Sequence, residues 1–141
     1  MDTMPAFLNH VAIPFSVESD PVNFYTRILG FTEKYRFTLD NETAWKIFGV
    51  YMELPVIVVV KDELKIELFK VPFTENHSIS HLCLFYKDID AVCRQAEKSG
   101  FRVVKTRRES GEVAFIRDSS NNIFELKRIQ SGDQTNSQQY S

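Results

Sequence analysis

Hydrophobic and polar residues alternate along several short stretches of this chain, and such alternation predicts β-strands. In the stretch FLNHVAIPF (residues 7–15), Leu8, His10 and Ala12 point to one face, and a more hydrophobic set that includes Phe15 points to the other. Further strands are predicted at residues 34–39, 44–52, 56–60, 65–71, 81–86, 102–107, 113–117 and 123–129. The chain is therefore expected to be rich in short strands.

Helical periodicity occurs at two places between these strands. One helix is predicted after Asp88, whose side chain can cap the first turn, and it ends at Gly100, which can adopt the left-handed conformation. Its apolar stripe consists of Ile89, Val92, Cys93 and Ala96. The other helix is predicted to have Asp20 as its N-cap and Pro21 as its first residue, and to end before Gly30.

The order of these elements occurs twice along the chain. HVAIPF precedes a helix that ends in LGF, and HLCLFY precedes a helix that ends in SGF. Each half then reads as a strand, a helix and about three strands. The sequence therefore predicts one α+β domain at residues 1–129, made of two βαβββ modules at about residues 7–71 and 79–129. Residues 130–141 are rich in Gln, Ser and Asn, and we expect them to be a disordered tail.

Charge and composition argue against several classes of function. The 141 residues include 17 Lys and Arg against 19 Asp and Glu, without the basic block that a nucleic-acid surface needs. The longest apolar run, at residues 54–60, is far shorter than the roughly 20 residues of a membrane helix, and no secretory signal precedes it. We therefore expect a cytoplasmic protein with no nucleic-acid or membrane partner. Cys83 and Cys93 lack metal-site spacing, and both are expected to be small buried hydrophobes.

Four polar residues stand at equivalent places in the two halves. His10 and His81 lie in the first strand of each half, and Glu67 and Glu125 lie in the last. Alternation places all four on the side opposite the apolar face that the helices are expected to cover. Alone, a histidine or glutamate in a strand is usually only a partly exposed residue, but the repetition favours a site. Imidazole and carboxylate suit a divalent ion such as Zn, Ni or Co, with Mn or Fe(II) as alternatives.

These residues carry a family resemblance that extends from Leu8 to Ile129. The segments LNHVAIPF, NFYTRILGF, KIELFKV, SHLCLFYKDIDAV, KSGFRV and VAFIRDSSNNIFELKRI, in this order, resemble the vicinal oxygen chelate superfamily. This superfamily contains the glyoxalase, bleomycin-resistance and extradiol-dioxygenase fold. The resemblance implies a curled mixed sheet with helices on its outer face, and a metal that a substrate binds through adjacent oxygens. It places the metal ligands at His10, Glu67, His81 and Glu125.

The implied ligand set is similar to that of glyoxalase I, which isomerises the hemithioacetal of methylglyoxal and glutathione. The resemblance implies a lyase or isomerase that moves a proton next to a carbonyl through a metal-stabilised enediolate. Glu125 would be the leading catalytic base and Glu67 the second, and the substrate would be a thiol adduct or an acyl-CoA. A ring-cleaving dioxygenase is disfavoured, because a fourth protein ligand would occupy a position that oxygen or catechol needs. The alternatives are a methylmalonyl-CoA epimerase-like enzyme and a non-catalytic binding or antibiotic-resistance member.

The roles of several other residues stay open at this point. The cationic side chains that either pair with an anionic substrate or lie solvated at strand ends are Arg36, Lys105, Arg107 and Arg108. His77 is either a loop residue or an auxiliary ligand. The side chains that either line the cup or fill the core are Trp45, Phe48, Tyr51 and Met52. A homodimer is expected, because pairing of two chains can cover exposed sheet edges, whose backbone N–H and C=O groups would otherwise lack hydrogen-bond partners.

Overall fold

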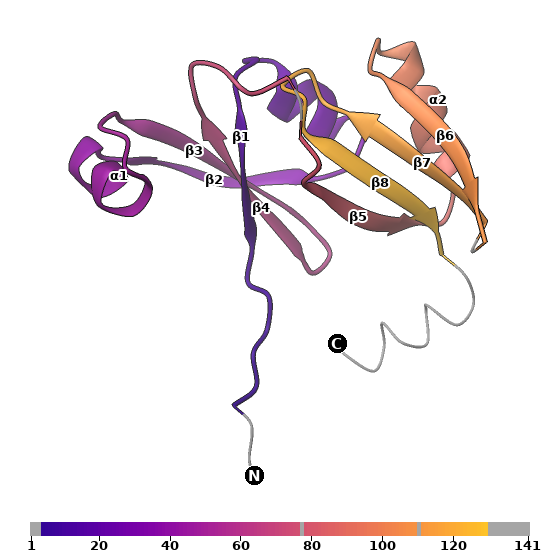
Figure 1. The fold of residues 1–141 in the computed structure, drawn as a ribbon, viewed down its shortest axis with the longest axis horizontal. Coiled ribbons are helices and arrows are strands. Elements are labelled where there is room, and N and C mark those ends of the chain that lie inside the picture. The colour runs from indigo at the N-terminus through magenta and orange to yellow at the C-terminus, as the bar shows by residue number, and fades with distance from the viewer. Residues whose placement is uncertain (1–3, 77, 110, 130–141) are drawn as a thin grey trace. The chain divides into compact units, whose positions relative to one another are not determined.

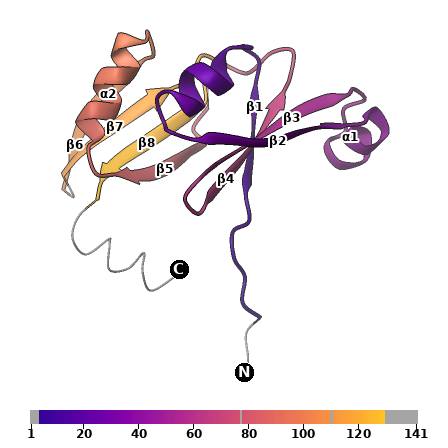
Figure 2. The same cartoon turned by 180° about the vertical axis from the view of Figure 1, so that it is seen from behind.

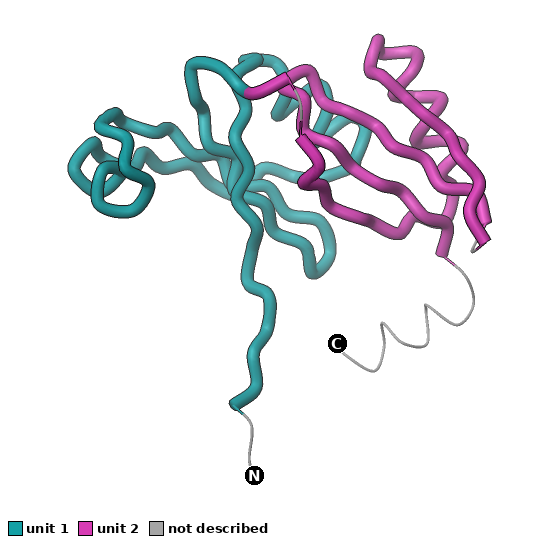
Figure 3. The backbone as a smooth tube through the Cα atoms, viewed as in Figure 1, with its two compact units in different colours: residues 1–74 teal, residues 75–141 magenta. Residues whose placement is uncertain are grey.

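Two four-stranded mixed sheets form the protein, one in each of two compact units. The computed structural model describes residues 4–76, 78–109 and 111–129. Unit 1 is Met1–Thr74 and unit 2 is Glu75–Ser141 (Figure 3). The predicted α+β class is confirmed. The single domain at residues 1–129 stays a prediction, because the chain divides into two compact units. The predicted tail at residues 130–141 and His77 lie outside the described residues.

Unit 1 contains four strands and two helices (Figure 1). Its elements are β1 (Val11–Phe15), the π-helix η1 (Pro21–Thr26), β2 (Thr32–Leu39), α1 (Asn41–Phe48), β3 (Leu54–Lys61) and β4 (Leu64–Lys70). The strand order is β1-β4-β3-β2. Strand β1 is parallel to β4, and the other neighbours are antiparallel. The first and last strands of the unit therefore lie side by side.

Unit 2 repeats this sheet. Its elements are β5 (His81–Tyr86), α2 (Ile89–Lys98), β6 (Val103–Arg108), β7 (Gly111–Arg117) and β8 (Ile123–Arg128). The strand order is β5-β8-β7-β6, with β5 parallel to β8 and the other pairs antiparallel. Helix α2 lies along one face of this sheet (Figure 2). The predicted internal repeat is confirmed at the level of strand order and direction.

The two predicted helices begin where their capping residues stand. The Asp88 carboxylate accepts a hydrogen bond from the Ala91 backbone N–H at 3.0 Å, and Gly100 ends α2 with a φ of +89°. Helix η1 begins at Pro21 as predicted, although the Asp20 side chain makes no capping hydrogen bond. Its hydrogen bonds join residues five apart, such as Leu29 N to Phe24 O at 3.0 Å, so this helix is of the π type.

The strand predicted at residues 44–52 is wrong, because its first half belongs to α1. The Asp40 carboxylate accepts a hydrogen bond from the Thr43 backbone N–H at 2.8 Å, and this bond caps the start of the helix. Gly49 follows the helix with a φ of +74°, and its N–H donates to the Trp45 carbonyl. The caps therefore decide the local structure, against aromatic residues that favour a strand. Without this strand the first module has the four strands of a βαβββ module, with α1 inserted between β2 and β3.

Burial follows the alternation that the sequence predicts. Ile66 and Leu68 of β4 are at most 2% exposed, and so are Phe124 and Leu126 of β8. In unit 2 this buried face packs against α2. The intervening side chains of β4 and β8 therefore stand on the face opposite the core. None of the helices in the described ranges is long and apolar enough to cross a membrane.

The two cysteines differ in burial, which corrects one prediction. Cys93 lies on the buried face of α2, as expected, whereas Cys83 is exposed. Cys83 stands in β5 on the same face as His81, so the alternation of the strand takes it away from the core. Desolvation raises the pKa of both thiols, and the Glu125 carboxylate raises the pKa of Cys83 further.

Alkylation of the native protein should therefore distinguish the two thiols. We expect iodoacetamide to modify Cys83 and to spare Cys93 until the chain is unfolded, with the sites read by peptide mass spectrometry. Because the pKa of Cys83 is raised, less thiolate exists at a given pH, and its alkylation rate should rise at higher pH than that of free cysteine. Equal labelling of both thiols in the native protein would contradict the assigned burial, and Cys83→Ser provides the control for peptide assignment.

Candidate metal centre

In unit 1, His10 and Glu67 form a close pair. His10 directly precedes β1, and Glu67 lies in β4, which is paired with β1. The His10 Nε2 atom lies 3.3 Å from the Glu67 Oε1 atom. The register places Ala12, two residues after the histidine, opposite Glu67. Parallel pairing of the first and last strands therefore joins two residues that are far apart in sequence.

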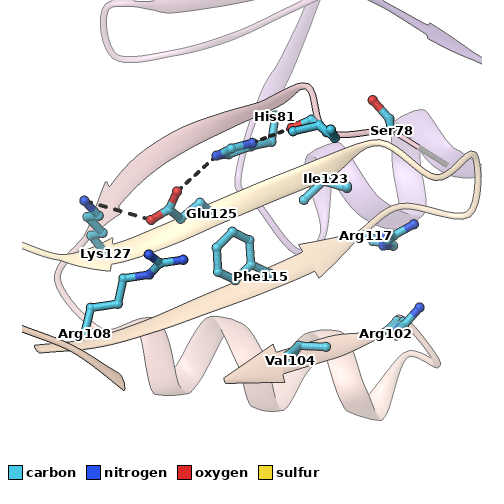
Figure 4. A pocket seen from close by; sticks show the side chains of 11 residues that line it. Ser78, His81, Arg102, Val104, Arg108, Phe115, Arg117, Ile123, Glu125 and Lys127 are labelled. Atoms are coloured by element: carbon cyan, nitrogen blue, oxygen red, sulfur yellow. Dashed lines mark hydrogen bonds and ion pairs between the residues drawn. The ribbon is translucent and has the colours of Figure 1, made fainter. Parts of the chain in front are cut away.

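Unit 2 holds the same pair at the same register. His81 is the first residue of β5, and Glu125 lies in β8. The His81 Nε2 atom lies 3.1 Å from the Glu125 Oε1 atom (Figure 4). Cys83, two residues after the histidine, lies opposite Glu125, as Ala12 lies opposite Glu67. Each module therefore presents one imidazole and one carboxylate in the same geometry.

Both carboxylates are largely withdrawn from solvent. The exposed fraction of the side chain is 15% for Glu67 and 13% for Glu125, against 37% for His10 and 35% for His81. Each glutamate stands in an inner strand of its sheet, where neighbouring strands shield it on both sides. A carboxylate in such a place needs a partner of positive charge or several donors. In both units the histidine is the nearest side chain that could provide such a partner, by a proton on Nε2 or by a cation that it shares with the carboxylate.

The hydrogen bonds of the two imidazoles limit what can lie between the histidine and the glutamate of each pair. The His81 Nδ1 atom lies 2.8 Å from the Ile79 carbonyl oxygen, which only accepts, so Nδ1 carries the proton. In neutral His81 the Nε2 atom then has a lone pair that faces the Glu125 oxygen, a second acceptor. His10 has the same arrangement, with Nδ1 at 2.7 Å from the side-chain oxygen of Asn9. Two acceptors at such a distance require a proton or a cation to stabilise them.

The distances within the pairs fit two ligands of one ion. Nitrogen and oxygen ligands bind Zn²⁺ at about 2.0–2.2 Å, which separates two ligands by about 3.0 Å at a right angle and about 3.4 Å at a tetrahedral angle. The observed separations of 3.3 Å and 3.1 Å agree with this range. A histidine that donates its other N–H to an oxygen is also the usual orientation of a metal ligand. The donor set of each pair therefore fits a divalent cation.

The structure joins the four predicted residues as two pairs. It brings His10 to Glu67 and His81 to Glu125, and the pairs belong to different units. Within the part of the chain that the structure describes, His, Cys, Asp and Glu side chains form no cluster of three or more suited to a metal ion. Each unit therefore contains two of the four candidate ligands, and both their role as ligands and the convergence of all four stay predictions.

A pocket of about 630 Å³ in unit 2 contains the His81–Glu125 pair. Figure 4 shows Phe115 beside this pair, and the His81 and Phe115 ring centroids are 6.0 Å apart. The cationic side chains of the lining are Arg102, Arg108, Arg117 and Lys127. Only Arg108 was among the predicted candidates. Extending the alternation from Glu125 to Lys127 and from Phe115 to Arg117 would have found two of the others.

The other cationic candidates have different surroundings. Arg36 forms an exposed ion pair with Glu33 at 2.8 Å, and Lys105 lies 3.7 Å from Asp90. Arg107 is exposed and does not line the pocket. For these three residues the reading as solvated surface charges agrees with the structure.

The aromatic residues of α1 and the following loop divide into two groups. Phe48 and Met52 line a pocket of about 450 Å³ in unit 1, whose lining is almost entirely apolar. Phe48 packs edge-to-face against Phe69 of β4, with ring centroids 5.6 Å apart. Trp45 and Tyr51 are 58% and 64% exposed, so they do not fill the core.

Comparisons with known proteins agree with this architecture. The family model described as the Glyoxalase/Bleomycin resistance protein/Dioxygenase superfamily matches residues 8–126. The fosfomycin resistance protein FosX of Listeria monocytogenes is similar in structure, with a TM-score of 0.71, 14% identity and coverage of 92% of this chain and 98% of that one. A glyoxalase family protein of Bacillus cereus has a TM-score of 0.72 and 17% identity, with coverage of 89% and 95%. Another FosX structure holds Mn(II) and sulfate. A sequence comparison with curated proteins gave no match.

The orientation of His10 generates a testable prediction. Asn9→Ala removes the acceptor that holds the His10 Nδ1 proton, so metal affinity should fall about tenfold while the fold is retained. Titration of the metal against a chelator of known affinity measures this change. Asn76→Ala, at an exposed position outside both pairs, is the matched control and should leave the affinity unchanged. Equal affinity in wild type and Asn9→Ala would contradict the role of this hydrogen bond.

Proposed function

Because the chain belongs to the Glyoxalase/Bleomycin resistance protein/Dioxygenase superfamily, we propose that it is a metal-dependent lyase or isomerase of the glyoxalase I type. Such an enzyme moves a proton next to a carbonyl group of its substrate. The observation that carries the proposal is the repeated pair of a histidine and a largely buried glutamate at 3.3 Å and 3.1 Å. The repeat supplies two imidazoles and two carboxylates, which serve both metal binding and proton transfer.

In this proposal His10, Glu67, His81 and Glu125 hold one divalent ion. The two pairs come together from the units of one chain or from two chains of a homodimer. Zn, Ni and Co suit this donor set, and Mn and Fe(II) are the alternatives. The Mn(II) in a FosX structure supports the use of a divalent metal within the superfamily. When bound, the ion polarises the substrate carbonyl as a Lewis acid and lowers the cost of removing the neighbouring proton.

Glu125 is the leading candidate for the catalytic base. Its Oε1 atom faces His81, whereas its Oε2 atom lies 3.9 Å from Lys127 Nζ and is directed away from the histidine. Oε1 would therefore be the atom that helps to hold a bound ion, and Oε2 would be the atom that accepts the substrate proton. Phe115 lies edge-to-face beside the His81 ring, with ring centroids 6.0 Å apart, and gives the pair an apolar neighbour in the pocket. Glu67, which forms the corresponding pair with His10 in unit 1, is the second candidate.

Two other activities of the same fold remain candidates. Methylmalonyl-CoA epimerization also removes a proton next to a carbonyl, so the same four residues support it. A resistance or binding role is favoured by the cationic pocket of unit 2. One FosX variant was solved with Mn(II) and dihydroxypropylphosphonic acid, a small anion. Assays with the methylglyoxal hemithioacetal of glutathione, with methylmalonyl-CoA and with fosfomycin, each under Ni, Co, Zn and Mn, distinguish the three.

Replacement of the base tests the proton-transfer role directly. Glu125→Gln should retain the fold and lower the exchange of the substrate proton with solvent by about a hundredfold or more, because the amide cannot accept the proton. Exchange is measured by NMR in deuterated buffer with the substrate that turns over. Glu97→Gln, on the exposed side of α2, is the matched control. Full exchange in Glu125→Gln would remove the assigned role.

Removal of the metal tests the other half of the proposal. Treatment with a chelator should abolish turnover, and addition of one divalent ion per site should restore it. Circular dichroism before and after treatment separates loss of metal from loss of fold. Turnover that survives complete metal removal would refute a metal-dependent mechanism, and a protein that binds no metal would favour the non-catalytic binder.

A further inference from the structure

The pocket of unit 2 is strongly cationic although the whole chain is slightly acidic. Arg102, Arg108, Arg117 and Lys127 line it together with a single carboxylate, that of Glu125. The formal net charge of the chain is −2, so this accumulation is local. Cationic walls around a concave space raise the local concentration of anions.

The sheet register fixes where these cations stand. The Arg117 backbone N–H donates to the Arg102 carbonyl at 3.2 Å, so these two residues are neighbours at one end of the pocket. Lys127 lies opposite Val113, and Arg108 ends β6 near the same end of the sheet. Figure 4 shows Arg102 and Arg117 at one end and Arg108 and Lys127 at the other.

The three arginines lack anionic partners within the described part of the chain. None of them forms an ion pair with a described carboxylate, and the nearest such contact of Lys127 is 3.9 Å, to Glu125. By contrast, Arg36 binds Glu33 at 2.8 Å and Arg128 binds Asp90 at 3.1 Å. Cationic side chains that share a pocket without counter-charges repel one another, and a bound anion relieves this repulsion.

An apolar floor lies between the two cationic ends. The register aligns Val104, Phe115 and Glu125 across β6, β7 and β8, and Ile123 stands beside Arg117. The space of about 630 Å³ far exceeds that of a single inorganic anion and leaves room for a carbon skeleton over Phe115. The reacting pair His81–Glu125 borders the same floor.

We infer that the pocket of unit 2 binds a small organic anion with at least two negative charges, held by Arg102, Arg108, Arg117 and Lys127. A single negative charge would leave most of the cationic lining unmatched, and a neutral or cationic ligand would gain nothing from it. Carboxylate, phosphate and phosphonate groups share the planar or tetrahedral oxygens that guanidinium binds in a bidentate way. That this anion is the reacting substrate rests on the proposed function, whereas its binding does not.

Calorimetric titration of chelator-treated, metal-free protein at low ionic strength tests the inference. At a pH above the second pKa of methylphosphonate, the probes are succinate and methylphosphonate as dianions, acetate as a monoanion and succinamide as an uncharged analogue of succinate. We expect at least one dianion to bind about tenfold more tightly than acetate, and succinamide not to bind. A preference for succinate indicates two separated carboxylates, and a preference for methylphosphonate indicates a phosphoryl-type group.

Two variants locate the binding. Arg108→Gln and Arg117→Gln, one at each end of the pocket, should each weaken dianion binding about fivefold or more. Arg107→Gln is the matched control, because this exposed neighbour in β6 does not line the pocket. Circular dichroism and thermal unfolding check that all three variants are folded.

Two results would overturn the inference. One is dianion binding no tighter than that of acetate, and the other is equal weakening in Arg107→Gln and in the pocket variants. Because the titration uses metal-free protein, failure of the proposed enzyme activity leaves the anion site intact. Conversely, metal-dependent turnover of an uncharged substrate without dianion binding would remove only this inference.

Discussion

A carboxylate on an inner strand, facing the Nε2 atom of a histidine, is the constraint on which the site depends. The apolar side chains before and after each glutamate are buried in the core, so the strand holds the carboxylate on the opposite face. The Nδ1 proton of each imidazole is already donated to an oxygen. Nε2 and the carboxylate then face each other as acceptors, which is unfavourable until a positive charge lies between them. Both modules need such a positive charge, because each places its glutamate opposite the residue two positions after its histidine.

Most of the correct predictions from the sequence, for the strands and for the face on which the site residues lie, came from strand periodicity. It placed His10, Glu67, His81 and Glu125 on one kind of face, and the parallel pairing of first and last strands then joined them into pairs. It failed at α1, where the Asp40 cap and Gly49 outweigh the aromatic residues between them. Which cations share a pocket depends on the register between β6, β7 and β8, which a single strand does not encode.

The two units contain different kinds of pocket. In unit 2 the pair lies among arginines and a lysine over an aromatic floor, which suits a charged substrate. In unit 1 the pocket that Phe48 and Phe69 line is apolar, and Phe69 lies two residues after Glu67 on the same face of β4. The same repeated fold therefore offers different chemistry on its two modules.

Metal coordination is the most direct test of the central claim, that both pairs bind a single ion. Zinc K-edge X-ray absorption on protein reconstituted with Zn²⁺, together with metal analysis, counts the ions per chain and the imidazoles per ion. We predict one zinc ion per chain, coordinated by two imidazoles and by carboxylate oxygens. Two zinc ions per chain with one imidazole each, or a zinc ion without imidazole ligands, would contradict the account.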